Sequence, residues 1–209
     1  MSVDVRAETD AVARLRTEAS AVRRAAPLAP EDRRAAIVAA VAPLVREHGR
    51  DITSRQIAEA AGVAEGTVFR AFGDKDSLIA AVVDHLLDPE PFYEALRDID
   101  PGEPLERKIE GIVRLLRARF AGVMGVMRAM RGPAGPGTPS PSRYVAIVAE
   151  TIQPDRERLA VPVEDVAHLL RLVTFASAIQ PFNREREFST EELASFVARG
   201  ITAREAKEG

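Results

Sequence analysis

Apolar residues recur at every third or fourth position through most of the chain, which is the spacing that one face of a helix requires. The first clear stripe belongs to a helix that begins at Pro30, a residue suited to a first helical turn, and ends at His48 and Gly49. No segment alternates apolar and polar residues as a half-buried strand would. The pattern predicts an all-α fold, with further helices at about 53–61, 64–71, 74–88, 91–98, 104–121, 122–131, 141–153, 163–180 and 190–206.

A capping box and a glycine mark two short helices in the first half of the chain. Thr53 and Gln56 can satisfy the free N–H groups of a helix start. Gly62 ends this helix, because glycine tolerates the left-handed backbone of a tight reversal. In the second helix, Val68 and Ala71 can face inward. Two short helices joined in this way are the layout of a helix-turn-helix, and with the preceding helix they predict a three-helix domain.

The segment IAEAAGVAEGTVFRAFGDKDSL, residues 57–78, resembles the DNA-binding signature of the TetR family of transcriptional regulators. It carries Ile-Ala, Ala-Gly-Val, Gly-Thr, an aromatic residue, Phe, Lys and Leu in one register over about twenty residues. Phe69 stands where the family usually has Tyr, and Ala71 where His or another aromatic is common, so two phosphate contacts of the family are missing. A helical hairpin that merely packs is the alternative interpretation of the segment.

The resemblance implies that the second helix is a recognition helix, which enters the major groove of DNA. We expect Thr67 and Arg70 to reach base edges or the adjacent backbone, and Lys75 to reach phosphate. Glu65 has two interpretations: it accepts from a cytosine amino group, or it only suits the helix N-terminus. The residues expected to contact operator DNA are Thr53, Ser54, Arg55, Glu65, Gly66, Thr67, Phe69, Arg70 and Lys75.

The charge of the chain does not by itself favour nucleic acid as a partner. The net charge is −3, and residues 29–88 hold seven basic and ten acidic side chains. A regulator of a defined operator can nevertheless work with a local basic patch, and Arg55, Arg70 and Lys75 fall on or beside the expected face. The alternative function is a TetR-like ligand-binding protein that has lost specific DNA binding.

Three regions follow from these patterns and from the resemblance. Residues 1–28 form an N-terminal extension, which is either a disordered arm or a segment whose Arg23 and Arg24 reach DNA beside the recognition helix. Residues 29–88 are the expected DNA-binding domain with its linking helix. Residues 89–209 are the expected helical ligand-binding and dimerisation domain.

Apolar residues cover almost the whole circumference of the helix expected at 163–180, and such a helix must be buried on both sides. The resemblance implies that it pairs, together with the helix at 190–206, with the same helices of a second subunit in a homodimer. An internal core hairpin of a monomer is the alternative. The expected interface residues are Val166, Leu169, Val173, Ala176, Phe196, Val197 and Gly200.

A small-molecule ligand is also implied by the resemblance, bound between helices of the C-terminal region. Methionines adapt to apolar compounds, although ordinary core packing is the alternative for each of them. The low aromatic content and the absence of Trp favour an aliphatic or acyl ligand over a large planar cation. The candidate ligand-binding residues are His85, Phe92, Tyr93, Arg117, Phe120, Met124, Met127 and Tyr144.

Other function classes lack the residues that they need. The chain has no cysteine, and its histidines, His48, His85 and His168, fall on separate helices, so we expect no metal site, cofactor or disulfide. No nucleophile elbow, paired His and carboxylate, or phosphate-binding loop suggests an enzyme. Without an apolar run of membrane length or a signal peptide, we expect a cytoplasmic protein. These patterns favour a dimeric repressor that a small molecule releases from an inverted-repeat operator.

Overall fold

The structure is a computed structural model that describes residues 29–132, 141–179 and 186–203. The expected N-terminal extension, with Arg23 and Arg24, lies outside these residues. The helical elements are α2 (Pro30–His48), the 3-10 helix η1 (Gly49–Asp51), α3 (Ser54–Ala61), α4 (Glu65–Phe72), α5 (Lys75–Leu87), α6 (Glu90–Arg97), α7 (Leu105–Ala129), α8 (Pro141–Ile152), the 3-10 helix η2 (Gln153–Arg158), α9 (Val163–Ala178) and α10 (Thr190–Ile201).

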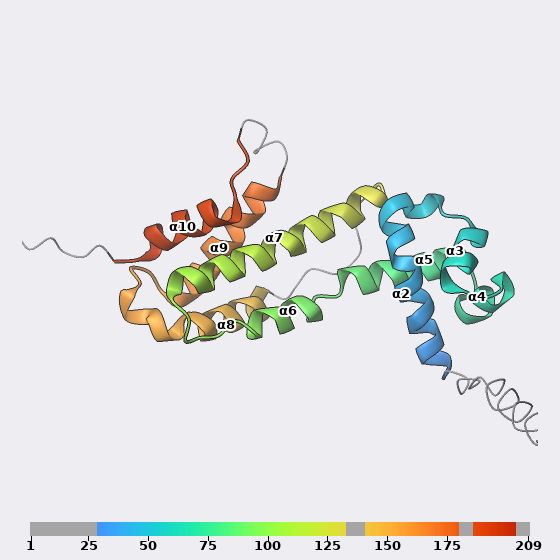
Figure 1. The fold of residues 1–209 in the computed structure, drawn as a ribbon, viewed down its shortest axis with the longest axis horizontal. Coiled ribbons are helices and arrows are strands. Elements are labelled where there is room, and N and C mark those ends of the chain that lie inside the picture. Colours follow the sequence, from blue (N-terminus) through green and yellow to red (C-terminus); the bar gives the residue numbers. More distant parts are fainter. Residues whose placement is uncertain (1–28, 133–140, 180–185, 204–209) are drawn as a thin grey trace, which may run out of the picture.

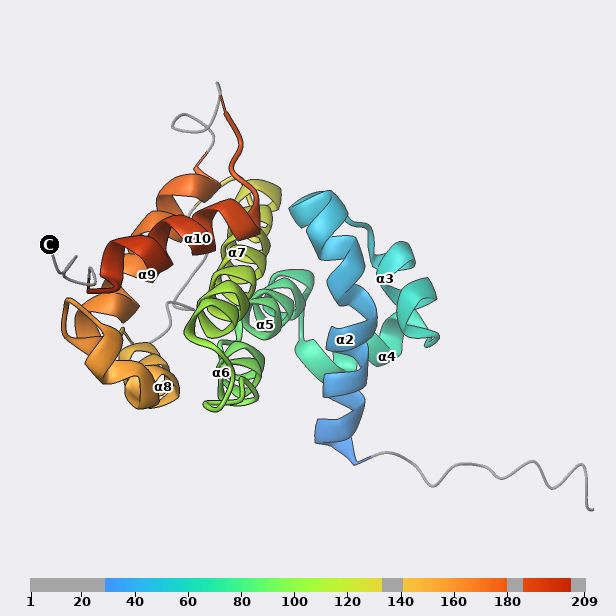
Figure 2. The same ribbon diagram turned by 60° about the vertical axis from the view of Figure 1, so that its left-hand side comes forward.

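The prediction of an all-α fold is confirmed. Within the described ranges, β-type pairing is limited to one isolated antiparallel bridge between Leu159 and Thr202. The helices form two groups in an elongated molecule, with α2, α3 and α4 at one end and α8, α9 and α10 at the other (Figure 1). Figure 2 shows the same division from a second direction, with α5 and α7 between the two groups. None of the described helices is both long and apolar enough to span a bilayer.

The N-terminal core is built by α2 to α5 around the predicted apolar stripe of α2. Val41 and Val45 of this stripe are buried, as are Leu78 and Val82 of α5, which packs along α2. Val126 of α7 also belongs to this core, with only 2% of its surface exposed. The N-terminal helices are therefore supported by a side chain that comes from far along the sequence.

The C-terminal core lies between α6, α7, α8, α9 and α10. Its largest buried side chains include Tyr93 and Tyr144, whose bulk fills the space between α6, α8 and α9. Lys108 of α7 is also buried, and its ammonium pairs with Asp155 and donates to the Pro101 carbonyl at 2.8 Å. A buried charge needs such partners, so this pair fixes η2 on the start of α7.

Two predicted helix boundaries are wrong. The expected break between residues 121 and 122 is absent, and α7 runs unbroken through Gly122 and Gly125. A glycine within a helix costs roughly 1 kcal/mol, and the packing of Val126 in the N-terminal core offsets this cost. The last helix ends at Ile201 rather than 206, because the Ala203 N–H donates to the Arg158 carbonyl at 2.9 Å and pulls the chain away.

Close contacts join the end of α7 to the N-terminal helices. Gly49 adopts φ 58° at the end of α2, and a Cβ atom at this position would lie 2.0 Å from the Ala129 carbonyl oxygen. Only glycine therefore fits there. Beside it, Arg131 pairs with Asp51 at 2.9 Å. The approach is close enough that α7 and α2 are held in one relative position.

Candidate DNA-binding face

The first helix of the expected pair begins and ends as its sequence predicts. The Gln56 N–H donates to the Thr53 hydroxyl at 3.2 Å, and the Thr53 N–H donates to the Gln56 side-chain oxygen at 2.9 Å, so the capping box is confirmed. Gly62 ends α3 in the left-handed conformation, at φ 64° and ψ 29°. The turn that follows brings Val63 onto the N-terminal core. Both ends of α3 are thus fixed by local interactions.

The second helix, α4, presents one side to the core and the other to solvent. Val68 is buried as predicted, Ala71 packs partly buried against the same core, and Phe72, which the prediction did not place inward, is buried there as well. The larger aromatic side chain reaches further into the core than a methyl group can. The predicted contact residues of α4 are all on its accessible side, with Thr67 partly exposed and Glu65, Gly66, Phe69 and Arg70 exposed.

Arg55 lies on the first turn of α3 and is already paired. Its Nε donates to Glu59 at 2.8 Å, and both side chains are well exposed. Exposed pairs at this helical spacing are weak, so the guanidinium can leave Glu59 for another anion at little cost. Thr53 and Ser54 stand beside it, but the Thr53 hydroxyl is occupied by the cap.

The Lys75 ammonium already has two backbone partners, which the sequence did not reveal. Its ammonium donates to the carbonyl oxygens of Arg50 and Ile52, both at 2.9 Å. The Arg50 carbonyl belongs to η1 and the Ile52 carbonyl to the link before α3, and both lie within reach because α5 packs along α2. Lys75 therefore ties the start of α5 to the segment that precedes the helix pair.

The start of α5 is also fixed by a cap. Asp74 accepts a hydrogen bond from the Ser77 N–H at 2.7 Å, and this bond lowers the pKa of the Asp74 carboxyl. The carboxylate therefore stays charged at the positive end of the helix dipole. A negative charge beside Lys75 makes this helix start a poor place for a phosphate group.

Arg34 of α2 was missed by the sequence analysis. Its guanidinium donates to the Ala71 carbonyl and lies over the Phe72 ring, 4.4 Å from the ring centroid. The Ala71 carbonyl is in the last turn of α4, where carbonyl groups lack partners within the helix. Arg34 thus fixes the end of α4 against α2. No sequence signal links these residues, because the contact joins positions 37 residues apart.

Comparison with known proteins places this face in a family. Residues 37–82 match the profile of the bacterial regulatory proteins of the tetR family, and this range contains α3, its glycine turn and α4. In this range the chain is similar to the tetR family. The family consists of regulatory proteins, in keeping with the expectation that the chain is not an enzyme.

Two curated relatives match part of this chain. An HTH-type transcriptional repressor of Mycobacterium tuberculosis and an HTH-type transcriptional regulator of Mycobacterium bovis are each 39% identical over 95 residues. The match covers 45% of this chain and 50% of each relative. The chain thus spans about half the length of the curated relatives it matches.

Solved structures share the TetR-family fold. A TetR-family transcriptional regulator of Pectobacterium atrosepticum is 24% identical, with a TM-score of 0.53 over 84% of this chain and 96% of the other. A second protein, whose structure describes control of antibiotic production by bacterial hormones, is 20% identical, with a TM-score of 0.55 over 81% of this chain and 97% of the other. At these identities the likeness concerns the fold alone.

The predicted interface residues divide into two sets. Val166 and Val197 are buried in the chain's own C-terminal core, where α9 and α10 pack on α7, so neither offers a surface to a partner. This corrects the expectation for both. The other five are accessible in the single chain: Val173 is partly exposed, and Leu169, Ala176, Phe196 and Gly200 are exposed.

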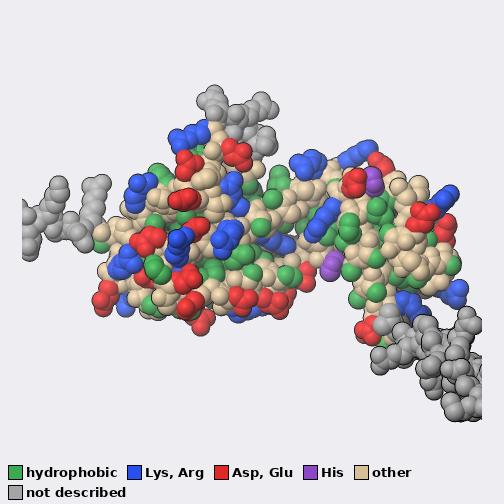
Figure 3. All heavy atoms as spheres, in the orientation of Figure 1, with side chains coloured by type: hydrophobic (Ala, Val, Ile, Leu, Met, Phe, Trp, Pro, Cys, Tyr) green, Lys and Arg blue, Asp and Glu red, His purple; other side chains and the backbone are tan. Residues whose placement is uncertain are grey.

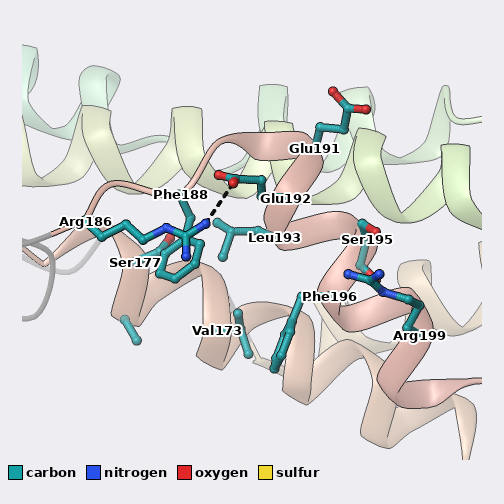
Figure 4. Close-up of a pocket in the computed structure, with 11 residues that line it drawn as sticks. Val173, Ser177, Arg186, Phe188, Glu191, Glu192, Leu193, Ser195, Phe196 and Arg199 are labelled. Carbon is teal, nitrogen blue, oxygen red and sulfur yellow. Dashed lines mark hydrogen bonds and ion pairs between the residues drawn. The ribbon is translucent and has the colours of Figure 1, made fainter.

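An open groove of about 940 Å³ lies between α9, α10 and the segment before α10. Figure 4 shows Val173 and Phe196 side by side at this groove, with Arg186 paired to Glu192 above them. The groove therefore has an apolar floor with charged residues at its edge. Its lining residues are Val173, Ala176, Ser177, Arg186, Phe188, Glu191, Glu192, Leu193, Ser195, Phe196 and Arg199.

The aromatic ligand candidates pack together instead of surrounding a space. The Phe92 ring stacks on Tyr144 with centroids 6.2 Å apart and contacts Tyr93 at 5.7 Å. The Tyr144 hydroxyl donates to the Ala167 carbonyl at 3.2 Å, and burial raises its pKa. Tyr93 and Tyr144 are fully buried, so the core-packing interpretation holds for them in this conformation.

The other ligand candidates are spread over α5 and α7. His85 is exposed on α5, and Arg117 donates to the Phe188 carbonyl at 2.7 Å. Phe120 meets Phe175 edge to face with centroids 5.2 Å apart. Met124 and Met127 continue the outer side of α7, with Met124 exposed and Met127 partly exposed. The structure does not bring these residues into one site.

Proposed function

We propose that the protein is a DNA-binding transcriptional repressor that reads an inverted-repeat operator with the exposed side of α4. The observation that carries the proposal is this side itself: Thr67, Phe69 and Arg70 face solvent on a helix whose other side is anchored by Val68 and Phe72. A rigid helix with accessible polar and aromatic side chains suits the major groove. The family match and the names of the mycobacterial relatives support the same function.

We propose a division of labour between residues 29–88, which read DNA, and residues 89–209, which bind a second subunit. Leu172, Phe175 and Phe196 support the second role, since 64%, 43% and 67% of their surfaces are exposed. Exposed apolar residues gathered on one side of a protein mark an interaction surface. Two subunits that pack through these residues about a two-fold axis would present two copies of α4, one to each half of an inverted repeat.

The proposal includes release of the operator by a small apolar molecule that binds beside α7. Phe120, Met124 and Met127 are only partly covered there, which leaves apolar surface for a ligand. Because α7 also supplies Val126 to the N-terminal core, a ligand that favours another position of α7 would favour another position of the reading helices.

Selection of bound sequences from a random pool of DNA duplexes tests the proposed function. Wild-type protein should enrich an inverted repeat, and a Thr67→Ala, Arg70→Ala double variant should not. Arg46→Ala is the matched control, because Arg46 is exposed in the last turn of α2. Failure of the wild type to enrich any sequence would favour the alternative, a TetR-like protein that has lost specific DNA binding.

A further inference from the structure

A cluster of arginines lies between the first turns of α2 and the outer side of α4. The two helices enclose a small open notch of about 330 Å³. Figure 3 shows basic side chains gathered at the foot of the N-terminal helices, beside the start of α2. The residues that line the notch include three arginines and one hydroxyl, but no carboxylate: Pro30, Arg33, Arg34, Thr67, Arg70 and Ala71.

We infer that this notch binds a DNA phosphate of each operator half-site, held by Arg33 and Arg34 of α2 together with Arg70 of α4. The inference rests on the proposed function and adds a second helix to the DNA-contacting surface. A guanidinium presents a planar fork of N–H donors that matches the oxygens of a phosphate. Three guanidinium groups in one notch provide a local positive charge, although the net charge of the chain is negative.

Contacts within the protein already hold the Arg34 side chain in place. One end of its guanidinium donates to the Ala71 carbonyl, and its plane lies over Phe72 at 4.4 Å. An arginine has five N–H donors, so this contact leaves others for a phosphate. Because the side chain is already fixed, binding costs less conformational entropy than it would for a free arginine.

The position of the notch suits the DNA backbone rather than the bases. Thr67 and Arg70 lie one turn apart on α4, and Arg33 and Arg34 face them from a different helix. When a recognition helix occupies the major groove, the first helix of the motif, here α3, crosses the phosphate backbone, and the notch between α2 and α4 lies beside the same recognition helix. A group bound between the two helices would therefore belong to the strand at the edge of the groove.

Acidic side chains near the notch limit where the phosphate can lie. Glu31 and Asp32 are exposed on the first turn of α2, and Glu65 is exposed at the start of α4, but none of these lines the notch. Their repulsion would keep a phosphate from the starts of both helices. The arginine side of the notch is the position left between them.

The test compares Arg33→Gln and Arg34→Gln with Arg46→Gln, which removes the same charge from the far end of α2. Binding to the enriched operator and to a random duplex is measured between about 50 and 200 mM salt. Each lost phosphate contact should make the plot of log affinity against log salt concentration shallower by about 0.9. Between the two salt concentrations, the affinity of the variant should therefore fall by a factor that is roughly threefold smaller than the factor for the wild type. Base preference should stay unchanged, since phosphate contacts carry no sequence information.

Arg34→Gln also loses the contact to Ala71, so Arg34→Lys and thermal unfolding serve as its controls. Restored salt dependence in Arg34→Lys would support the phosphate contact. Slopes in Arg33→Gln and Arg34→Gln equal to that of Arg46→Gln would overturn the inference while leaving DNA binding intact. If the wild type bound neither duplex, the proposed function would fail and the inference with it.

Discussion

Three cationic side chains in this protein donate to backbone carbonyls at the ends of helices. Arg34 meets the Ala71 carbonyl at the end of α4, Lys75 meets those of Arg50 and Ile52 after α2, and Arg119 meets those of Leu87 and Asp88 at the end of α5. The carbonyls at the ends of α4 and α5 lack partners within their helix and carry the negative end of its dipole, while those of Arg50 and Ile52 lie in and just after the short η1. Each cation therefore joins two helical elements. Burial also lowers the pKa of the Arg119 guanidinium.

Lys75→Met should destabilise the protein by about 2 kcal/mol, because hydrogen bonds from a charged group contribute roughly 1.5–3 kcal/mol. Arg55→Met is the control and should cost under about 0.5 kcal/mol, since its pair with Glu59 is exposed. Urea denaturation measures both. The salt dependence of DNA binding should be the same in Lys75→Met as in the wild type. A shallower dependence with unchanged stability would instead return Lys75 to the phosphate role.

Two buried threonines differ in what their hydroxyls do. The Thr174 hydroxyl has no hydrogen-bond partner among the described residues, whereas the Thr151 hydroxyl donates to the Ile147 carbonyl at 2.9 Å. Thr174→Val should raise the free energy of unfolding by up to about 1 kcal/mol, because it removes a buried polar group that nothing satisfies. Thr151→Val should lower it by about 1 kcal/mol. Equal losses in both variants, measured by thermal unfolding, would contradict this account.

The elements that could be predicted are those with local signals. The capping box at Thr53 and the glycine at 62 fix α3 through contacts within a few residues, so the sequence reveals them. The continuity of α7 depends on Val126 in a distant core, and the contacts of Arg34 and Lys75 involve carbonyls 23 to 37 residues away. Every residue type carries a backbone carbonyl, so the sequence does not show which carbonyl a distant cation will contact. The contacts of Arg34 and Lys75 in the candidate site could therefore not be predicted.

Gly49→Ala and Gly62→Ala should separate steric conflict from backbone conformation. Both glycines have positive φ, but a Cβ at Gly49 would meet the Ala129 carbonyl, while one at Gly62 would meet nothing within 4 Å. Gly62→Ala should cost about 1 kcal/mol, the usual cost of a left-handed alanine. Gly49→Ala should cost about 3 kcal/mol or more, since strain and overlap add. Similar unfolding temperatures for the two variants would show that α7 does not press on Gly49.

At the scale of the molecule, large apolar side chains of α9 and α10 remain exposed. An amphipathic pattern shows that α9 has two apolar sides but not which of them faces its own subunit, which is why Val166 and Val197 were misassigned. The structure places these two in the core and leaves Leu172, Phe175 and Phe196 accessible. The dimer that we propose covers this second side.

Phe196→Glu should convert the proposed dimer to monomers that remain helical, because it would bury an unpaired carboxylate in each subunit. Sedimentation at micromolar concentration, with circular dichroism on the same samples, checks both points. Met124→Glu is the control, since Met124 is exposed on α7 away from the groove. A wild-type protein that sediments as a monomer at this concentration would rule out the proposed assembly.

The central claim is that the exposed side of α4 recognises a DNA sequence. The most direct measurement is the ratio of affinities for the enriched inverted repeat and for a shuffled duplex of equal composition, taken at one salt concentration. The account predicts a ratio of at least about 1,000 for the wild type, and a ratio reduced by roughly tenfold or more in the Thr67→Ala, Arg70→Ala double variant. Equal affinity of the wild-type protein for the two duplexes would contradict it.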